Sequence, residues 1–132
     1  MKVLKYHRYV LEGWMEHVDA LIRKQSLASL ASSIRKLERA LVSVQQKDSS
    51  TTVIAKRLKA LQMGLAALKS VWDNQVFAYT PKETDEAKTV LASLFPSLQA
   101  MASKFKPGSS QATLLIRRVR SLELALAALS EM

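Results

Sequence analysis

Two stretches of this chain, RLKALQMGLAALK at 57–69 and RVRSLELALAALS at 118–130, are nearly the same amphipathic sequence written twice. In both, apolar side chains recur every three or four residues, the spacing that places them on one face of an α-helix. No segment of the chain keeps the period-two alternation of a β-strand for long. The two stretches therefore predict a pair of similar helices within an all-α protein.

The similarity extends beyond these helices at a constant offset of 61 residues. The apolar positions of 30–44 fall on those of 91–105, and LAS at 30–32 recurs as LAS at 91–93. Any two helices rich in leucine and alanine resemble each other, but that does not readily explain two helices and a turn at one offset. We interpret the pattern as a duplicated helical hairpin, with copies at about 26–78 and 81–131.

The periodicity predicts an N-terminal helix within 1–23, followed by helices at about 26–46, 51–78, 81–106 and 109–131. Ser26 can cap the second helix, although one kinked helix through RKQS at 23–26 is also possible. TPKE at 80–83 predicts a helix start with a capping box, and Pro96 is expected to kink or split that helix. Because the connections are short, we expect consecutive helices to be antiparallel in a five-helix up-down bundle, one domain over 1–132.

Composition argues against several classes of protein. The chain has no cysteine, no run of apolar residues as long as a signal peptide near its start, and no membrane-spanning run. We therefore expect a cytoplasmic protein. His7 and His17 have no second metal ligand at a useful spacing, and there is no glycine-rich phosphate loop. We expect no catalytic residues, metal, cofactor or small-molecule substrate.

The formal net charge of +9, with a sequence pI of about 10.0, favours an anionic partner. A domain that is merely soluble and basic is the plain alternative. The up-down topology predicts that most basic residues gather at one end of the bundle. The candidate nucleic-acid-binding residues are Lys2, Lys5, Arg8, Arg39, Lys56, Arg57, Lys59, Lys104, Lys106, Arg117, Arg118 and Arg120.

Several of these cations are expected in the first turns of helices, where positive charge opposes the helix dipole. Helix N-termini have free N–H groups that bind phosphate, so basic residues there favour an anion site, repeated once by the duplication. Alternatively, the cations form a solvated face that pairs with acids such as Glu12, Glu16 and Asp19. Trp14 is near basic residues and can stack on bases, but its place on the apolar stripe favours the core.

The second half of each repeated helix is apolar nearly all round, which predicts burial on two sides. Five helices bury one central helix well, and we expect the helix at 51–78 to occupy that place. The outer face of the last helix, at Leu124 and Ala128, is then the candidate contact with another protein.

In size, charge and helicity, though in no shared motif, the chain resembles the small basic helical subunits that line nucleic acid in multi-subunit RNA-guided CRISPR effector complexes. The resemblance implies a non-catalytic subunit that binds nucleic-acid backbone, RNA or DNA, and neighbouring protein subunits. The main alternative is a helical adaptor, chaperone or inhibitor that binds an acidic protein. Attachment to an anionic membrane surface is a third reading.

Overall fold

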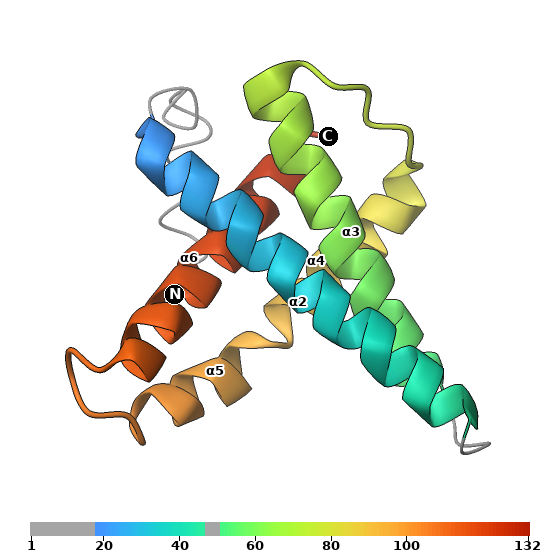
Figure 1. Cartoon of the computed structure of the whole chain (residues 1–132). Coiled ribbons are helices and arrows are strands. Elements are labelled where there is room, and N and C mark those ends of the chain that lie inside the picture. Colours follow the sequence, from blue (N-terminus) through green and yellow to red (C-terminus); the bar gives the residue numbers. More distant parts are fainter. Residues whose placement is uncertain (1–17, 47–50) are drawn as a thin grey trace.

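The computed structural model describes residues 18–46 and 51–132 (Figure 1). The helices are α2 (Ala20–Gln46), α3 (Thr52–Asp73), α4 (Pro81–Ala92), α5 (Phe95–Ala102) and α6 (Ser110–Leu129). Because α4 and α5 are two pieces of one helical segment, the described residues form four helices, and they contain no β-strand. The all-α prediction is therefore confirmed.

The start of α2 differs from the prediction. Residues 2–17 of the predicted first helix lie outside the described residues, and residues 18 and 19 are not helical. The Asp19 side chain accepts a hydrogen bond from the backbone N–H of Leu21 at 2.7 Å, which is how a capping residue begins a helix. From Ala20 the helix continues through RKQS without a break, so the predicted cap at Ser26 is wrong. Ser26 instead lies in the second turn of α2, and its side chain is buried.

Helix α3 ends five residues earlier than predicted. Asn74 adopts the left-handed conformation, with φ of 56°, and its N–H bonds to the carbonyls at the end of α3. Asparagine adopts this conformation more readily than most residues, and it stops a helix in the same way as a C-terminal glycine. The apolar residues that follow, up to Tyr79, form an irregular connection.

The predicted start of α4 is confirmed, and its capping box is complete. The Thr80 hydroxyl accepts from the Glu83 N–H at 3.1 Å, while Glu83 Oε1 accepts from the Thr80 N–H at 3.1 Å. Pro81 occupies the first helical position. Further along, Pro96 lies in the first turn of α5, and the helix is interrupted before it at residues 93 and 94. The proline therefore splits the predicted 81–106 helix instead of only kinking it.

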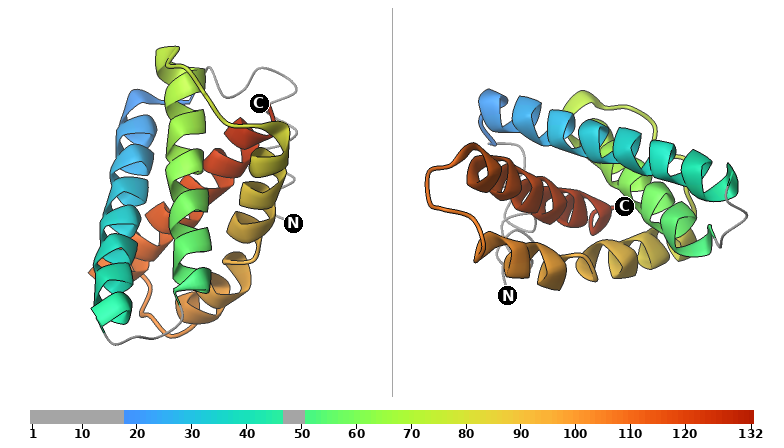
Figure 2. Two further views of the ribbon diagram at one scale, coloured as in Figure 1. Left: turned by 90° about the vertical axis from the view of Figure 1, so that its right-hand side faces the viewer. Right: turned by 60° about the horizontal axis from the view of Figure 1, so that its bottom comes forward.

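The described helices alternate in direction. Figure 2 shows α2, α3 and α4 side by side, with successive helices antiparallel, and α6 inclined across them. Helix α6 contacts α2, α3, α4 and α5, so it joins both sides of the bundle. The C-terminal end of α2 and the start of α3 lie together, whereas the start of α6 lies on the opposite side of the molecule in the right view of Figure 2.

Small residues allow α6 to approach its neighbours closely. A Cβ built on Gly64 of α3 would lie 3.0 Å from the Cβ of Ala125 and 3.4 Å from Leu91 Cδ1. Where α6 crosses α2, Ser121 Oγ lies 3.5 Å from Ser29 Oγ. Larger side chains at these crossings would separate the helices, because protein interiors are already close-packed.

Both α3 and α6 are buried on more than one side, so α3 is not the sole central helix. Every residue from Ser121 to Leu129 is buried. Leu124 and Ala128, the predicted contact with another protein, are each 0% exposed. The expectation of a free outer face on the last helix is therefore corrected, because the rest of the chain already covers these two side chains.

Candidate nucleic-acid interface

The predicted basic residues fall into separate environments. Lys2, Lys5 and Arg8 lie outside the described residues. Arg39 is exposed on α2, and Lys104 and Lys106 are exposed in the connection between α5 and α6. The remaining six lie on α3 and α6, and their neighbours decide which of them can bind an anion.

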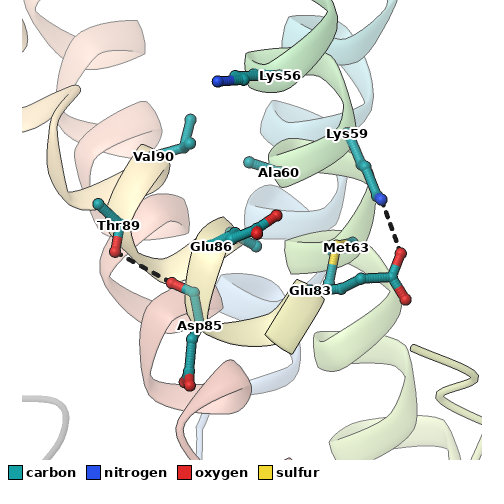
Figure 3. Close-up of a pocket in the computed structure, with 10 residues that line it drawn as sticks. Lys56, Lys59, Ala60, Met63, Glu83, Asp85, Glu86, Thr89 and Val90 are labelled. Carbon is teal, nitrogen blue, oxygen red and sulfur yellow. Dashed lines mark hydrogen bonds and ion pairs between the residues drawn. The ribbon is translucent and has the colours of Figure 1, made fainter. Parts of the chain in front are cut away.

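Lys56 and Lys59 line a pocket of about 520 Å³ between α3 and α4 (Figure 3). Carboxylates occupy the facing helix, where Glu83, Asp85 and Glu86 line the same pocket. Lys59 Nζ lies 2.7 Å from Glu83 Oε2. This side of α3 therefore presents positive and negative charge together, and it does not favour a polyanion.

The ion pair between Lys59 and Glu83 affects both groups. The hydrogen bond from Lys59, followed by the backbone hydrogen bond at Thr80, lowers the pKa of Glu83 below its ordinary value. The hydrogen bond and charge of Glu83 raise the pKa of Lys59. Both shifts favour the charged forms, so this part of α3 is internally compensated.

The sequence suggested that the arginines of α6 lie at the N-terminus of that helix, and the structure differs. Helix α6 begins at Ser110, so Arg117 and Arg118 are about two turns into it, beyond the first turn to which the helix-dipole effect is confined. Arg120 is engaged within the chain, since its Nη2 donates to Gln25 Oε1 at 3.1 Å. Only side-chain charge, then, can attract an anion to Arg117 and Arg118.

The opposite side of α3 is different, because basic residues of three helices line one depression there. Lys36 of α2, Arg57 of α3 and Arg118 of α6 line one pocket of about 280 Å³, which we call the three-cation pocket. Its other lining residues are Ser33, Leu37, Leu61, Ser93, Leu94, Ser97, Leu98 and Leu122. No acidic residue is among the described residues of this lining. Lys36 and Arg57 are exposed, whereas Leu61 and Leu122 are buried, so the charges surround an apolar floor.

A second basic depression, of about 360 Å³, lies between α2 and α6. We call it the α2–α6 groove. Lys24, Lys36, Arg117 and Arg118 line it together with Leu21, Gln25, Ala28, Ser29, Ser32 and Leu114. It shares Lys36 and Arg118 with the three-cation pocket, so the two adjoin. The described part of the groove lining is also free of acidic residues.

Sequence reasoning missed Lys24 and Lys36. The available signal was their spacing on α2, where Lys24, Ala28, Ser32 and Lys36 follow one another at intervals of four residues on one helix face. Small side chains between two lysines let another helix approach while the cations remain at its edge. That pattern indicates a basic groove only when the opposing helix carries further cations, here Arg117 and Arg118.

The lining of the three-cation pocket contains pairs of residues that are 61 positions apart. Arg57 and Arg118 form one pair, and Leu61 and Leu122 form another. The other pairs are Ser33 with Leu94, Lys36 with Ser97, and Leu37 with Leu98. Gly64 and Ala125, which meet where α3 crosses α6, have the same separation. The offset found in the sequence therefore also relates residues that are neighbours in space.

No family model matches this chain, and no curated protein or solved structure matches it. The described residues contain no group of three or more His, Cys, Asp and Glu side chains that could hold a metal ion. Among the helices of the described ranges, none has the length and apolar character needed to cross a membrane.

Proposed function

We propose that this protein is a non-catalytic cytoplasmic subunit that binds nucleic-acid backbone through the three-cation pocket and the α2–α6 groove. The observation that carries the proposal is the convergence of five cations from three helices on adjoining depressions lined by no described acidic residue. These cations are Lys24, Lys36, Arg57, Arg117 and Arg118.

None of these five side chains forms an ion pair or a side-chain hydrogen bond with another described residue. Lys59 and Arg120 were equally plausible from the sequence, but they already interact with Glu83 and Gln25. Phosphate groups need cations that are not neutralised within the protein, because affinity for nucleic-acid backbone comes largely from the release of counterions. With respect to the described residues, the five side chains meet that requirement.

The repeat bears on how the basic surface arose. We infer that residues 26–78 and 81–131 descend from one duplicated helical hairpin. The contact between Gly64 and Ala125 supports this, as does the pairing of Arg57 with Arg118 in one pocket. A duplication would double the cations contributed by one ancestral helix and bring both copies to the same depression.

A subunit of a larger ribonucleoprotein assembly also needs a surface for its protein neighbours. Leu124 and Ala128 are buried, so contact through them would require the bundle to open. Ile116 of α6 is 63% exposed, lies outside the lining of the α2–α6 groove and is better placed for such a contact. We propose it as the protein-facing residue of α6.

The test is a fluorescence-anisotropy titration of a labelled single strand and a labelled duplex at salt concentrations from about 50 to 300 mM. We expect a steep linear fall of log affinity with log salt. Arg117→Gln/Arg118→Gln should weaken binding at every salt concentration and reduce that slope by about one to two. Lys104→Gln/Lys106→Gln removes the same charge from the exposed α5–α6 connection and serves as the matched control.

Equal weakening by the two double variants would mean that net charge alone drives binding, and it would contradict the assignment of the groove. Absence of binding at the lowest salt concentration would contradict a nucleic-acid role altogether. The alternative, an acidic protein partner, is favoured by Leu21 and Leu114, which line the groove and are 60% and 62% exposed. It predicts tight binding of an acidic amphipathic helix and weak binding of nucleic acid.

A further inference from the structure

The three-cation pocket differs from the α2–α6 groove beside it. The groove lies between two helices, whereas four segments of the chain line the pocket, namely α2, α3, α6 and the region from Ser93 to Leu98. Arg57 belongs to the pocket alone, and Lys24 belongs to the groove alone. The pocket therefore adjoins the groove and adds Arg57, a cation from a third helix, to the two cations that both depressions share.

We propose that the three-cation pocket binds the terminal phosphate monoester of a nucleic-acid strand whose following residues lie in the α2–α6 groove. The inference rests on the proposed function and adds the part of the strand that is recognised. Lys36 and Arg118 lie at the junction and serve both depressions.

Charge favours a terminal phosphate over an internal one. An internal phosphodiester carries one negative charge, whereas a phosphate monoester carries about −1.5 to −2 at pH 7 and has three strong acceptor oxygens. Three cations from three helices match the larger charge. Two of them are arginines, whose planar guanidinium groups can each donate two parallel hydrogen bonds to one phosphate.

Hydroxyl groups add further donors at the pocket. Ser93 Oγ already donates to the Val90 carbonyl at 2.6 Å. The hydroxyls of Ser33 and Ser97 have no hydrogen-bond partner among the described residues, and both line the pocket. They can donate to phosphate oxygens that the cations leave unsatisfied.

The pocket floor favours the end of a strand for a second reason. Leu61, Leu98 and Leu122 are 4%, 8% and 2% exposed, so the cations surround a low-dielectric surface on which electrostatic attraction is stronger than in water. The described residues of the lining include no aromatic side chain on which successive bases could stack. A terminal nucleotide needs no stacking partner on its outer side, and its sugar can lie against the leucines.

The experiment compares three internally labelled strands of one sequence, carrying a 5′-phosphate, a 3′-phosphate or hydroxyl groups at both ends. We expect the wild-type protein to bind one phosphorylated strand about tenfold more tightly than the hydroxyl strand. Arg57→Gln should abolish this ratio, and it should weaken binding of the hydroxyl strand no more than Lys24→Gln does. Lys24→Gln, which removes the same charge from the groove, should weaken all three strands and keep the ratio.

The protonation of the monoester gives an independent readout. Its second pKa is about 6, so the preference for the phosphorylated strand should shrink as the pH falls from about 7.5 to 5.5. Lysine and arginine stay charged throughout this range, and an internal phosphodiester does not titrate in it. Loss of the ratio in acid therefore supports recognition of a monoester, and a ratio independent of pH would overturn it.

Equal affinity for all three strands would overturn the inference while leaving backbone binding intact. Failure to bind any strand would instead overturn the proposed function, and the inference with it. Inorganic phosphate and a nucleoside monophosphate serve as competitors. If either at millimolar concentration removed the preference, the pocket would be a site for a free phosphate compound, and the assignment to a strand end would be wrong. Circular dichroism of Arg57→Gln, a change at an exposed residue, serves as the control for folding.

Discussion

The crossing of α3 and α6 makes Gly64→Ala an informative substitution. At an exposed position within a helix, replacing glycine by alanine stabilises a protein by about 1 kcal/mol. Here the added Cβ would lie 3.0 Å from the Cβ of Ala125, closer than the 3.4–4 Å of an ordinary contact. The Ala125 Cβ is fixed to its backbone, so the helices must separate. Such overpacking costs about 1–3 kcal/mol, and the net effect should be a destabilisation of about 1 kcal/mol.

The companion substitution Ala125→Gly tests whether the two methyl positions compete. Alone, it should destabilise the protein by about 1–2 kcal/mol, because helix propensity and a buried contact are lost. In Gly64→Ala/Ala125→Gly, the methyl group is transferred from α6 to α3, and the clash disappears. The double variant should be close to the wild type and more stable than additivity predicts by about 2–3 kcal/mol.

Urea unfolding monitored by far-UV circular dichroism measures all four proteins at one temperature. An unchanged m-value is needed for each variant, so that changes in midpoint report stability. The reasoning is refuted if Gly64→Ala is more stable than the wild type and the double variant is additive. That result would mean that the methyl groups at 64 and 125 do not meet.

Three further outcomes follow from single sites. Asn74→Gly should keep or slightly raise stability and Asn74→Ala should lower it by about 1 kcal/mol in the same assay, because φ is 56° there. The pKa of Glu83 lies below its usual 4.5, so its ion pair with Lys59 stabilises the fold above that pH and is lost as the pH falls through the lowered pKa. Acid titration of Glu83→Gln should therefore show a smaller loss of stability below about pH 4.5 than the wild type. Leu124→Ala should cost about 2–4 kcal/mol on urea unfolding because Leu124 is 0% exposed, whereas Ile116→Ala, at a 63% exposed residue, should change stability by about 0.5 kcal/mol or less.

The helical class and several boundaries could be predicted because their signals are local. The spacing of the leucines, the capping box at 80–83 and the effect of Pro96 all act within a turn or two of the residues concerned. The boundary at RKQS failed because a polar tetrapeptide permits a break without requiring one. There, Ser26 is buried within an unbroken helix.

The candidate site was only partly predictable, because it depends on which helix faces meet. The repeat identified Arg57 and Arg118 as candidate binding residues, and both line the three-cation pocket. Nothing local distinguishes Arg57 from Lys59, two residues away. They point to opposite sides of α3, where one meets Lys36 and the other meets Glu83. That distinction is tertiary, and it also explains why Lys36 was missed.

The distribution of acids around α3 concentrates the charge of the protein. Glu83, Asp85 and Glu86 of α4 offset Lys56 and Lys59 on one side. The cations of α2 and α6 on the other side have no described acid in the pocket lining. The depressions between α2, α3 and α6 therefore carry positive charge that no described acid in their lining offsets. A polyanion that approaches the molecule should be directed to that side, because a surface lined by one sign of charge attracts ligands of the opposite sign.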